Sequence, residues 1–328
     1  MILAIETSCD DTCAAVIEGP RILSNVISSQ ARIHERFGGV VPEVASRHHL
    51  ELINSVVDAA LEDAGCELGG IEAVAVTTRP GLIGALLVGM SSAKALAAAR
   101  RLPMIAVDHL QGHIAAAFLE PEPLEPPFLA LIASGGHTLL AGVRDHGSHE
   151  VLGQTLDDAA GEALDKAARL LGLGYPGGPA IEREARSGDS EAFAFPVAMS
   201  HGPGLDFSFS GLKTALVYAV RDLPPGSLES ARADLAASFQ TAVVAQLVAK
   251  TRRALRNGEW QALVLGGGVA ANASLRERAA NACEEAGVRL KLVPSELCTD
   301  NAAMIGSAAR YAPRVEYPGY LGWDAAPR

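Results

Sequence analysis

The stretch that decides the fold lies at the start of the chain, where residues Met1–Ile17 read MILAIETSCDDTCAAVI. Apolar runs at both ends of this stretch flank the polar segment Glu6–Thr12, which is the pattern of a β-hairpin. Residues Phe128–Val143 repeat the layout as FLALIASGGHTLLAGV, with a polar tip at Ser134–Thr138. We therefore predict two hairpins, one opening each half of the chain.

A strand, a glycine-containing turn and a helix follow later in each half. In the first half, the run Ala73–Val76 leads through Arg79–Gly81 into a long apolar stretch. In the second half, Ala262–Leu265 leads into Gly266–Gly268 and a helix on whose first turn we place Asn272. The N-terminus of a helix that follows a strand and a glycine turn is a ready anion site. The duplicated layout predicts an α/β protein of two lobes that face each other across a cleft.

Length and composition agree with two lobes. The chain has 328 residues, whereas single hydrophobic cores stop growing near ~250–300 residues. Its 49 % hydrophobic and 20 % charged residues exclude a mostly disordered chain. The proline-rich stretch Pro121–Pro127 is the natural boundary. We predict an N-terminal lobe of residues 1–120 plus 300–328 and a C-terminal lobe of residues 121–299.

The charge balance argues against binding nucleic acid by basic excess. There are 27 basic and 38 acidic residues, which give a net charge of −11. Nucleic acid is then either not the substrate, or it is held by local arginines and a partner protein. Two local clusters occur, at Arg252–Arg256 and at Arg276–Arg278. Charge patterning favours a solvated helix face for both clusters.

The cysteines and the N-terminus indicate a cytoplasmic protein. The five cysteines are odd in number and scattered, and no CxxC pair occurs, so reduced thiols are expected. The N-terminus lacks a basic region before its short apolar run, unlike a signal peptide. No stretch approaches the ~20 apolar residues of a membrane span, and we expect no membrane anchor.

Three polar turns carry the groups that hold phosphate. Glu6–Thr12 supplies hydroxyls, backbone amides and three carboxylates, and Ser134–Thr138 contains two adjacent glycines. Gly266–Gly268 supplies a third turn, and glycine lets the backbone approach an anion closely. One such turn is usually only a tight turn. Three of them at matching places in two halves predict a phosphate-bearing nucleotide.

A pair of histidines suggests a metal site. We expect Asp108 to cap a helix that runs to about Leu119. His109 and His113 are then four residues apart on one helix face, a spacing that can hold a divalent metal with a third ligand. Two partly exposed histidines without a metal fit the pattern equally well. A zinc protease of the HExxH type does not fit, because Leu110 stands where its catalytic glutamate would be.

Two aspartates complete the candidate chemistry, and each has a plainer alternative. Asp300 is the candidate third ligand, but it could instead be only the N-cap of a helix that runs to about Tyr311. Imidazole with carboxylate suits iron or zinc. Asp165, before the rigid turn Tyr175–Pro179, is placed to accept hydrogen bonds from sugar hydroxyls. Its alternative is a surface ion pair with Lys166.

Together these segments resemble the tRNA threonylcarbamoyladenosine transferases, a family formerly described as O-sialoglycoprotein endopeptidases. The resemblance covers nearly the whole chain. Its marks are Ile5–Thr12, Val41–Arg47, Pro80–Leu82, His109 with His113, Ser134–Thr138, Asp157–Pro179, Phe207–Lys213 and Cys298–Ile305. The resemblance implies an actin- and sugar-kinase-like fold, that is, a duplicated ribonuclease-H-like fold with a central cleft.

The same resemblance implies an activity. The threonylcarbamoyl group would pass from threonylcarbamoyl-AMP to N6 of the adenosine 3′ of the anticodon, and AMP would leave. The tRNAs concerned read codons that begin with A. The enzyme is then an acyltransferase of tRNA modification. Because the chain has no fused kinase domain, it resembles the bacterial form, which works with a catalytically silent paralogue and a small ATPase.

The family pattern also implies roles for individual residues. His109, His113 and Asp300 would hold one divalent metal ion, Fe²⁺ before Zn²⁺. Asp11 would orient the attacking amine. The adenylate, or ATP, ADP or AMP in its place, would be bound by Ser134, Gly135, Gly136, His137, Thr138, Asp165, Gly178, Glu182 and Asn272. Gln111 and Arg79 depart from the family pattern, which commonly has glutamate and a small residue there.

Two other functions remain open at this point. A sugar or acid kinase, or a simple ATPase, on the same fold would need a γ-phosphate site but not two histidines on one helix. A non-catalytic scaffold of the paralogue type would typically lack the histidine pair, which this chain keeps.

Overall fold

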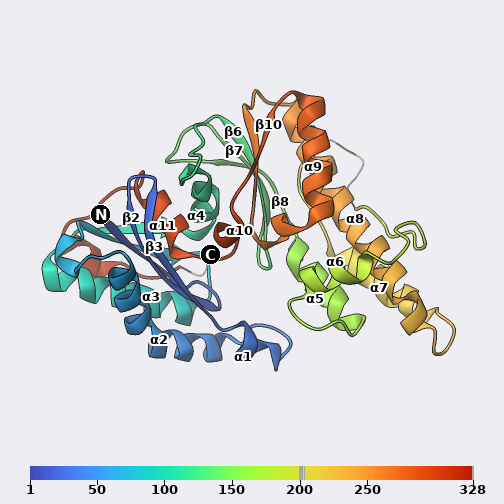
Figure 1. Ribbon diagram of the computed structural model, residues 1–328, viewed down its shortest axis with the longest axis horizontal. Helices are drawn as coiled ribbons and strands as arrows, with labels where there is room; N and C mark the ends of the chain where they lie inside the picture. Colours follow the sequence, from blue (N-terminus) through green and yellow to red (C-terminus); the bar gives the residue numbers. More distant parts are fainter. Residues whose placement is uncertain (199–201, 203, 327–328) are drawn as a thin grey trace. The chain divides into compact units, whose positions relative to one another are not determined.

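The computed structural model describes residues 1–198, 202 and 204–326 (Figure 1). The chain forms two compact units. Unit 1 comprises Met1–Glu125, Asp145–Ser148 and Pro294–Arg328, and unit 2 comprises Pro126–Arg144 and His149–Val293. The chain first passes from unit 1 to unit 2 within the proline-rich stretch.

Unit 1 is built on a five-stranded sheet in the order β3-β2-β1-β4-β5. The first three strands are antiparallel neighbours, and β4 and β5 run parallel to β1. Their bounds are β1 Ile2–Glu6, β2 Asp11–Glu18, β3 Arg21–Ser29, β4 Ala73–Arg79 and β5 Met104–Asp108. The predicted first hairpin is therefore present as β1 and β2, and its polar tip joins them.

Alternate residues of β1 serve the two faces of this sheet, as the period of two in a strand requires. Leu3 and Ile5 belong to a core that includes Ile53 from a long helix, α2. Ala4 faces the other side, where it lies against Gly306 of α11. The helical segments of unit 1 are α1 Ala31–Glu35, α2 Pro42–Asp63, η1 Leu68–Gly70, α3 Ile83–Arg100, α4 His109–Ala115, η2 Ala116–Phe118, α10 Ser295–Cys298, α11 Ala302–Ala309 and η4 Gly319–Gly322.

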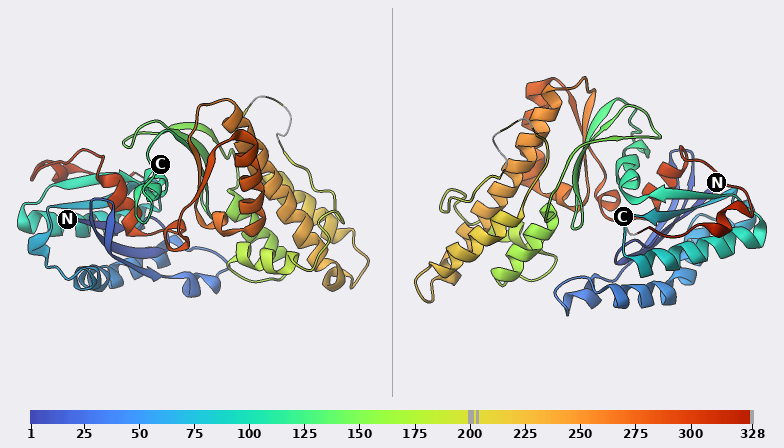
Figure 2. Two further views of the ribbon diagram at one scale, coloured as in Figure 1. Left: turned by 45° about the horizontal axis from the view of Figure 1, so that its top comes forward. Right: turned by 180° about the vertical axis from the view of Figure 1, so that it is seen from behind.

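The helices α2 and α3 pack side by side against one face of the sheet (Figure 2). α2 begins at Pro42, because proline is favoured in the first helical turn. Within the described residues, α3 is the one helix whose length and composition alone would let it cross a membrane. Its small and apolar residues Ala85, Gly89 and Ala93 are instead buried in unit 1.

Unit 2 repeats the topology of unit 1. Its sheet has the order β10-β9-β6-β7-β8, in which β6 pairs with β7 antiparallel and with β9 parallel. Read from β8 to β10, the strands have the same order and relative directions as those from β3 to β5 in unit 1. The bounds are β6 Phe128–Ala133, β7 Thr138–Val143, β8 Glu150–Gln154, β9 Ala262–Gly266 and β10 Arg289–Leu292. Both predicted hairpins and both predicted strand–turn–helix units are present.

The helical segments of unit 2 are α5 Ala160–Leu170, α6 Gly177–Ala185, α7 Ser210–Arg221, α8 Leu228–Arg256, η3 Gly268–Ala271 and α9 Ala273–Ala286. One detail of the prediction is wrong. A 3₁₀ turn follows the glycines, so Asn272 is the N-cap of α9 and not part of its first turn. Its side-chain oxygen accepts a hydrogen bond from the Leu275 amide at 3.0 Å, as an N-cap does.

Candidate metal centre and nucleotide-binding loops

The candidate metal centre of unit 1 begins where β5 ends. Asp108 caps α4 as predicted, accepting hydrogen bonds from the amides of Leu110 at 2.9 Å and Gln111 at 3.3 Å. The α-helix is shorter than predicted, because it ends at Ala115 and continues as a 3₁₀ turn. The N-cap at Asp108 still sets the face of α4 on which the two histidines lie.

His109 and His113 lie on one face of α4, as their spacing predicts. Their side chains are 4 % and 1 % exposed, and their rings meet edge to face with centroids 4.7 Å apart. The prediction left open two partly exposed histidines, and burial removes that alternative. A glycine makes the burial feasible, since any side chain at Gly112 would overlap with Ile305 of α11.

Asp300 completes the cluster. Its Oδ1 lies 3.5 Å from His109 Nε2 and 3.3 Å from His113 Nε2, and one ligand atom from each of the three residues lies within 4.8 Å of the others. The alternative role of Asp300 as a helix cap is wrong. The neighbouring Asn301 caps α11 through a bond of 2.9 Å from the Met304 amide, so the Asp300 carboxylate is turned to the histidines.

A buried carboxylate behind His109 sets the orientation of its ring. Glu6, at the end of β1, is fully buried, and its Oε2 lies 3.0 Å from His109 Nδ1. Ser8 Oγ lies 3.1 Å from the same nitrogen. An ionised carboxylate can only accept hydrogen bonds, so we assign the proton to Nδ1. Nε2 is then the ring nitrogen that faces Asp300 and the cluster, the arrangement that orients histidine ligands in metal sites.

The Glu6 carboxylate is itself held on both oxygens. Thr77 Oγ1 donates to Oε2 at 2.5 Å, and the Ser8 amide donates to Oε1. Burial opposes ionisation of Glu6, but the charge of His109 and these hydrogen bonds outweigh burial and lower its pKa. Glu6 therefore stays negative inside the protein.

The electrostatics of the cluster favour a cation. Burial disfavours a charged His109, yet the carboxylates of Asp300 and Glu6 overcome it and raise the pKa of His109 to about 9. Both ring nitrogens of His113 are buried and, in the described part of the chain, without a hydrogen bond. Two imidazoles and a carboxylate are a ligand set of iron and zinc sites. The residues present thus fit a divalent metal.

A buried histidine of α2 supports the turn between β1 and β2. His49 of α2 is fully buried, with Nδ1 2.7 Å from Thr12 Oγ1 and Nε2 2.9 Å from the Cys9 carbonyl oxygen. Burial lowers the pKa of His49, so the ring is neutral and fixes the turn by hydrogen bonds. Sequence reasoning missed this residue, although it lies two positions after the segment Val41–Arg47 singled out above.

Asp11, the first residue of β2, has an unusual carboxyl group. Its Oδ1 is buried and has no hydrogen-bond partner among the described residues. Burial, only partly offset by a hydrogen bond from Ser29, raises the pKa of Asp11 to about 7, and the charges of Asp10, Asp300 and Glu6 add to the increase. A carboxyl group with this pKa exchanges protons near neutral pH.

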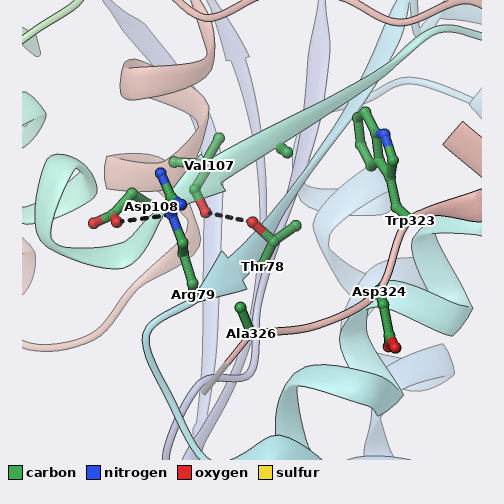
Figure 3. Close-up of a pocket in the computed structure, with 8 residues that line it drawn as sticks. Thr78, Arg79, Val107, Asp108, Trp323, Asp324 and Ala326 are labelled. Carbon is green, nitrogen blue, oxygen red and sulfur yellow. Dashed lines mark hydrogen bonds and ion pairs between the residues drawn. The ribbon is translucent and has the colours of Figure 1, made fainter. Parts of the chain in front are cut away.

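A cavity of about 290 Å³ opens at the ends of β4 and β5. Figure 3 shows the Arg79 guanidinium turned toward the Asp108 carboxylate, with Nε and Oδ2 3.3 Å apart. The chain near its C-terminus lies along the same edge, where the Ala326 amide donates to the Thr78 carbonyl oxygen at 3.0 Å. Arg79 therefore contacts the residue that caps α4.

The predicted phosphate turns of unit 2 lie together at the C-terminal ends of β6 and β9. The turn after β6 is closed by a hydrogen bond from the Ser134 amide to the His137 carbonyl oxygen at 2.8 Å. Gly267 of the second turn has a φ of +83° and lies so close to Ala133 that any side chain there would overlap with it. By contrast, the space around Gly135 and Gly136 is open. Parallel strand ends of this kind are where α/β sheets bind ligands.

Helix N-termini surround these turns. At the start of α5, the Gly161 amide donates to the Ser134 carbonyl oxygen at 3.1 Å. Thr138 supports the same junction, because its buried hydroxyl accepts from the Ala160 amide at 2.8 Å. Within the predicted turn, Ser134–His137 are partly or fully exposed. Thr138 instead connects the start of α5 to the loop through its hydrogen bond with Ala160.

Asp165 joins α5 to α6. Its Oδ1 accepts a hydrogen bond from the Gly177 amide at 2.7 Å, while Lys166 pairs with Asp158 and Glu162. The predicted alternative, an ion pair between Asp165 and Lys166, is therefore wrong. Burial raises the pKa of Asp165, and its bonds to the Gly177 and Gly178 amides partly offset this effect. Gly178, where an added Cβ would come no closer than 3.9 Å to Leu164, follows in the same turn.

Glu182 and Asn272 meet at the start of α9. Glu182 Oε1 accepts from the Ala273 amide at 3.0 Å, and Asn272 Nδ2 donates to Gln240 Oε1 at 2.8 Å. The amide group of Asn272 is thus engaged at both ends, so it fixes the third turn. Through Gly161, Asp165 and Glu182, the structure links all the predicted nucleotide-binding segments of unit 2.

The segment Phe207–Lys213, for which the sequence offered no role, is organised by Asp157. That carboxylate accepts hydrogen bonds from both the amide and the hydroxyl of Ser210, at 3.2 and 2.6 Å, and from the Ser208 hydroxyl at 2.6 Å. Burial acts against the ionised form of Asp157, but these bonds lower its pKa. Asp157 therefore serves as the cap of α7.

Comparisons with known proteins now bear on this arrangement. Residues 21–307 match the family model of TsaD, tRNA N6-adenosine threonylcarbamoyltransferase. A protein of that name from Clostridium botulinum (strain 657 / Type Ba4) is 52 % identical over 94 % of this chain and 92 % of its own length. One from Clostridium perfringens (strain SM101 / Type A) is 51 % identical over 95 % of this chain and 92 % of its own length. The chain belongs to the tRNA N6-adenosine threonylcarbamoyltransferase family.

Membership of the threonylcarbamoyltransferase family makes the chain a transferase of tRNA modification, and it does not favour the kinase alternative. Solved structures agree on the fold. Component A of (R)-2-hydroxyglutaryl-CoA dehydratase from Acidaminococcus fermentans has a TM-score of 0.56 and 15 % identity, covering 95 % of this chain and 96 % of that one. The ROK hexokinase of Thermus thermophilus has a TM-score of 0.50 and 16 % identity, covering 95 % and 98 %. The fold is that of the actin- and sugar-kinase-like proteins, as predicted.

Proposed function

We propose that this chain transfers the threonylcarbamoyl group of threonylcarbamoyl-AMP to N6 of the adenosine 3′ of the tRNA anticodon, with release of AMP. The tRNAs are those that read codons beginning with A. The observation that carries the proposal is the buried cluster of His109, His113 and Asp300 with Glu6 behind it. A kinase or ATPase has no use for two such histidines.

The cluster supports a resident metal, for which we propose Fe²⁺ first and Zn²⁺ second. His109 and His113 would each supply Nε2, and Asp300 would supply a carboxylate oxygen. Bound there, a divalent ion would act as a Lewis acid toward the carbonyl oxygen of the transferred group. Glu6 keeps the proton of His109 on Nδ1 and so leaves Nε2 available.

Asp11 is our candidate for orienting the attacking amine. An exocyclic amino group donates hydrogen bonds, and the buried Oδ1 of Asp11 lacks a donor among the described residues. With a pKa of about 7, the carboxylate can also take the proton that the amine loses as the new bond forms. His49 and Ser29 hold the segments on either side of Asp11 in place.

The loops of unit 2 support binding of the adenylate. The exposed backbone at Gly135 and Gly136 offers amides to its phosphate, in the manner of other glycine-rich turns. Asp165 and Glu182 keep carboxylate oxygens for ribose hydroxyls, Gly178 provides a partly exposed backbone surface, and Asn272 fixes the turn. AMP leaves from a mixed anhydride, so the reaction needs no protein nucleophile, only alignment of donor and acceptor.

We further propose that the chain works in the cytoplasm with partner proteins. By the family pattern, these are a catalytically silent paralogue and a small ATPase. With a net charge of −11, the chain gains little from non-specific attraction to tRNA, so partners and local arginines would supply it.

A modification assay tests the function. Wild type, with its partners, would receive an unmodified tRNA transcript and chemically prepared threonylcarbamoyl-AMP, and nucleosides would be read by mass spectrometry. We expect wild type to form threonylcarbamoyladenosine, and His109→Ala and Asp300→Asn to lose it while still binding AMP. His48→Ala is the matched control, because His48 is partly exposed on α2 and forms a salt bridge with Glu51. Turnover of ATP without any modified tRNA would overturn the proposal.

A further inference from the structure

The end of the unit 2 sheet opposite to the nucleotide loops carries a basic cavity. The loops follow the C-terminal ends of β6 and β9, whereas the cavity lies where β7 ends and β9 begins. Its volume is about 360 Å³, and it is lined by Arg144, Arg256, Asn257, Gly258 and Glu259. Arg144 directly follows β7, Arg256 is the last residue of α8, and the other three residues lie between α8 and β9.

Arg144 is held in place by a rigid aromatic platform. Its guanidinium carbon lies 5.1 Å from the centre of the Trp260 ring. Trp260 is 9 % exposed, and its Nε1 donates to the Ala254 carbonyl oxygen at 3.1 Å. Any side chain at Gly142 or Gly258 would overlap with the ring. Because the indole is packed and hydrogen-bonded, the guanidinium above it is oriented in advance to donate paired hydrogen bonds to an anion.

The acidic groups around the cavity are largely engaged elsewhere. Glu285 accepts from Arg252 at 2.9 Å, and Arg256, which is 70 % exposed, lies 3.9 Å from the same carboxylate. Asp145, next to Arg144, accepts from the Gly147 amide and the Ser148 hydroxyl. Of the acids, only Glu259 is among the residues that line the cavity. Two guanidinium groups thus face one carboxylate.

We propose that this cavity binds a phosphodiester of the tRNA backbone, through Arg144 and Arg256. Guanidinium groups match phosphate oxygens with paired hydrogen bonds. A chain of net charge −11 can attract RNA only at local sites where guanidinium groups outnumber carboxylates, as they do in the lining of this cavity. The position at the opposite strand ends separates this contact from the adenylate loops. The inference rests on the proposed function, because it takes tRNA as the substrate.

The experiment measures tRNA binding by the complete enzyme with its partners as a function of salt. Arg144→Gln, Arg256→Gln and the double variant would be titrated with an unmodified tRNA transcript between about 50 and 200 mM salt. Each single change should weaken binding on the order of fivefold at low salt and reduce the slope of log K against log salt by about 1. The transfer rate at saturating tRNA and the affinity for AMP should stay unchanged.

Controls separate the contact from other effects. Arg221→Gln removes an exposed unit 2 arginine that pairs with Asp222 and should leave binding and slope as in wild type. Within the described residues, Arg256 does not lie over an aromatic ring, so Arg256→Gln decides the question if Arg144→Gln lowers the melting temperature. If the wild-type enzyme is active and both single variants keep the wild-type slope of log K against log salt, this inference alone is overturned. A wild type that neither binds nor modifies tRNA would overturn the proposed function as well.

Discussion

Replacing Glu6 by glutamine should weaken the metal site without removing any ligand. The side chain keeps its size, but one carboxylate oxygen becomes an amide group that donates hydrogen bonds. Every contact of Glu6 with His109, Thr77 and Ser8 described above needs an acceptor. In either orientation, the new amide group therefore faces a donor.

The expected size of the effect follows from these contacts. Loss of a carboxylate behind a histidine ligand typically lowers metal affinity about 10- to 100-fold, which is about 1.4–2.7 kcal/mol. The mispaired hydrogen bond in a fully buried position should also lower the free energy of unfolding by about 1–3 kcal/mol. The protein should therefore still fold, and its affinity for metal should fall.

The assay is a competition for Zn²⁺ between the metal-free protein and a chromophoric chelator, with AMP affinity measured on the same samples. Glu72→Gln is the control, because Glu72 is 69 % exposed and pairs with the N-terminal amine far from the cluster. We expect Glu6→Gln to lose Zn²⁺ affinity and to keep AMP affinity. A folded Glu6→Gln variant that binds Zn²⁺ within about twofold of wild type would refute the role of Glu6.

Two further changes address Asp11 and the nucleotide loops. In metal-free protein, the pKa of Asp11 is raised from 3.8 to about 7, so the folded state loses stability as pH rises through this window. In urea at about pH 8, the free energy of unfolding of Asp11→Asn should therefore exceed that of wild type by about 1–2 kcal/mol. At about pH 5 the gain should be smaller. An equal gain at both values would contradict the raised pKa. Gly161→Ala would place a methyl group 2.5 Å from the Ser134 carbonyl oxygen, so calorimetry should show at least about tenfold weaker AMP binding with unchanged Zn²⁺ affinity. Unchanged AMP binding would show that this junction does not shape the loop.

The sequence predicted the central parts of the fold because they are encoded locally. β1, β6 and β9 are buried along their whole length, so each reads as an unbroken apolar run bounded by turn residues. The edge strand β3 was not recognised, since its burial is partial and irregular and it contains Ser24, Asn25 and Ser28. Edge strands carry little of the hydrophobic pattern on which such predictions depend.

The site was predictable where helical spacing carries the information. His109 and His113 are four residues apart on a capped helix, so their common face follows from the period of the helix. The same rule excludes the suggested pair of Asp165 with Lys166, because adjacent residues do not face each other on a helix. Asp300 and Asn301 are both good caps, and only the structure shows which of the two caps α11.

The role of Glu6 could not be found in this way. Its partner His109 lies 103 positions away, and no helical or strand period connects residues across that distance. They meet because β1 and β5 both pair with β4, so that their ends come together at one edge of the sheet. A local signal was nonetheless present, since Glu6 is a glutamate at the end of an otherwise wholly apolar strand. Burying a charge there is costly without a partner, and that cost itself indicates a cationic or protonated group nearby.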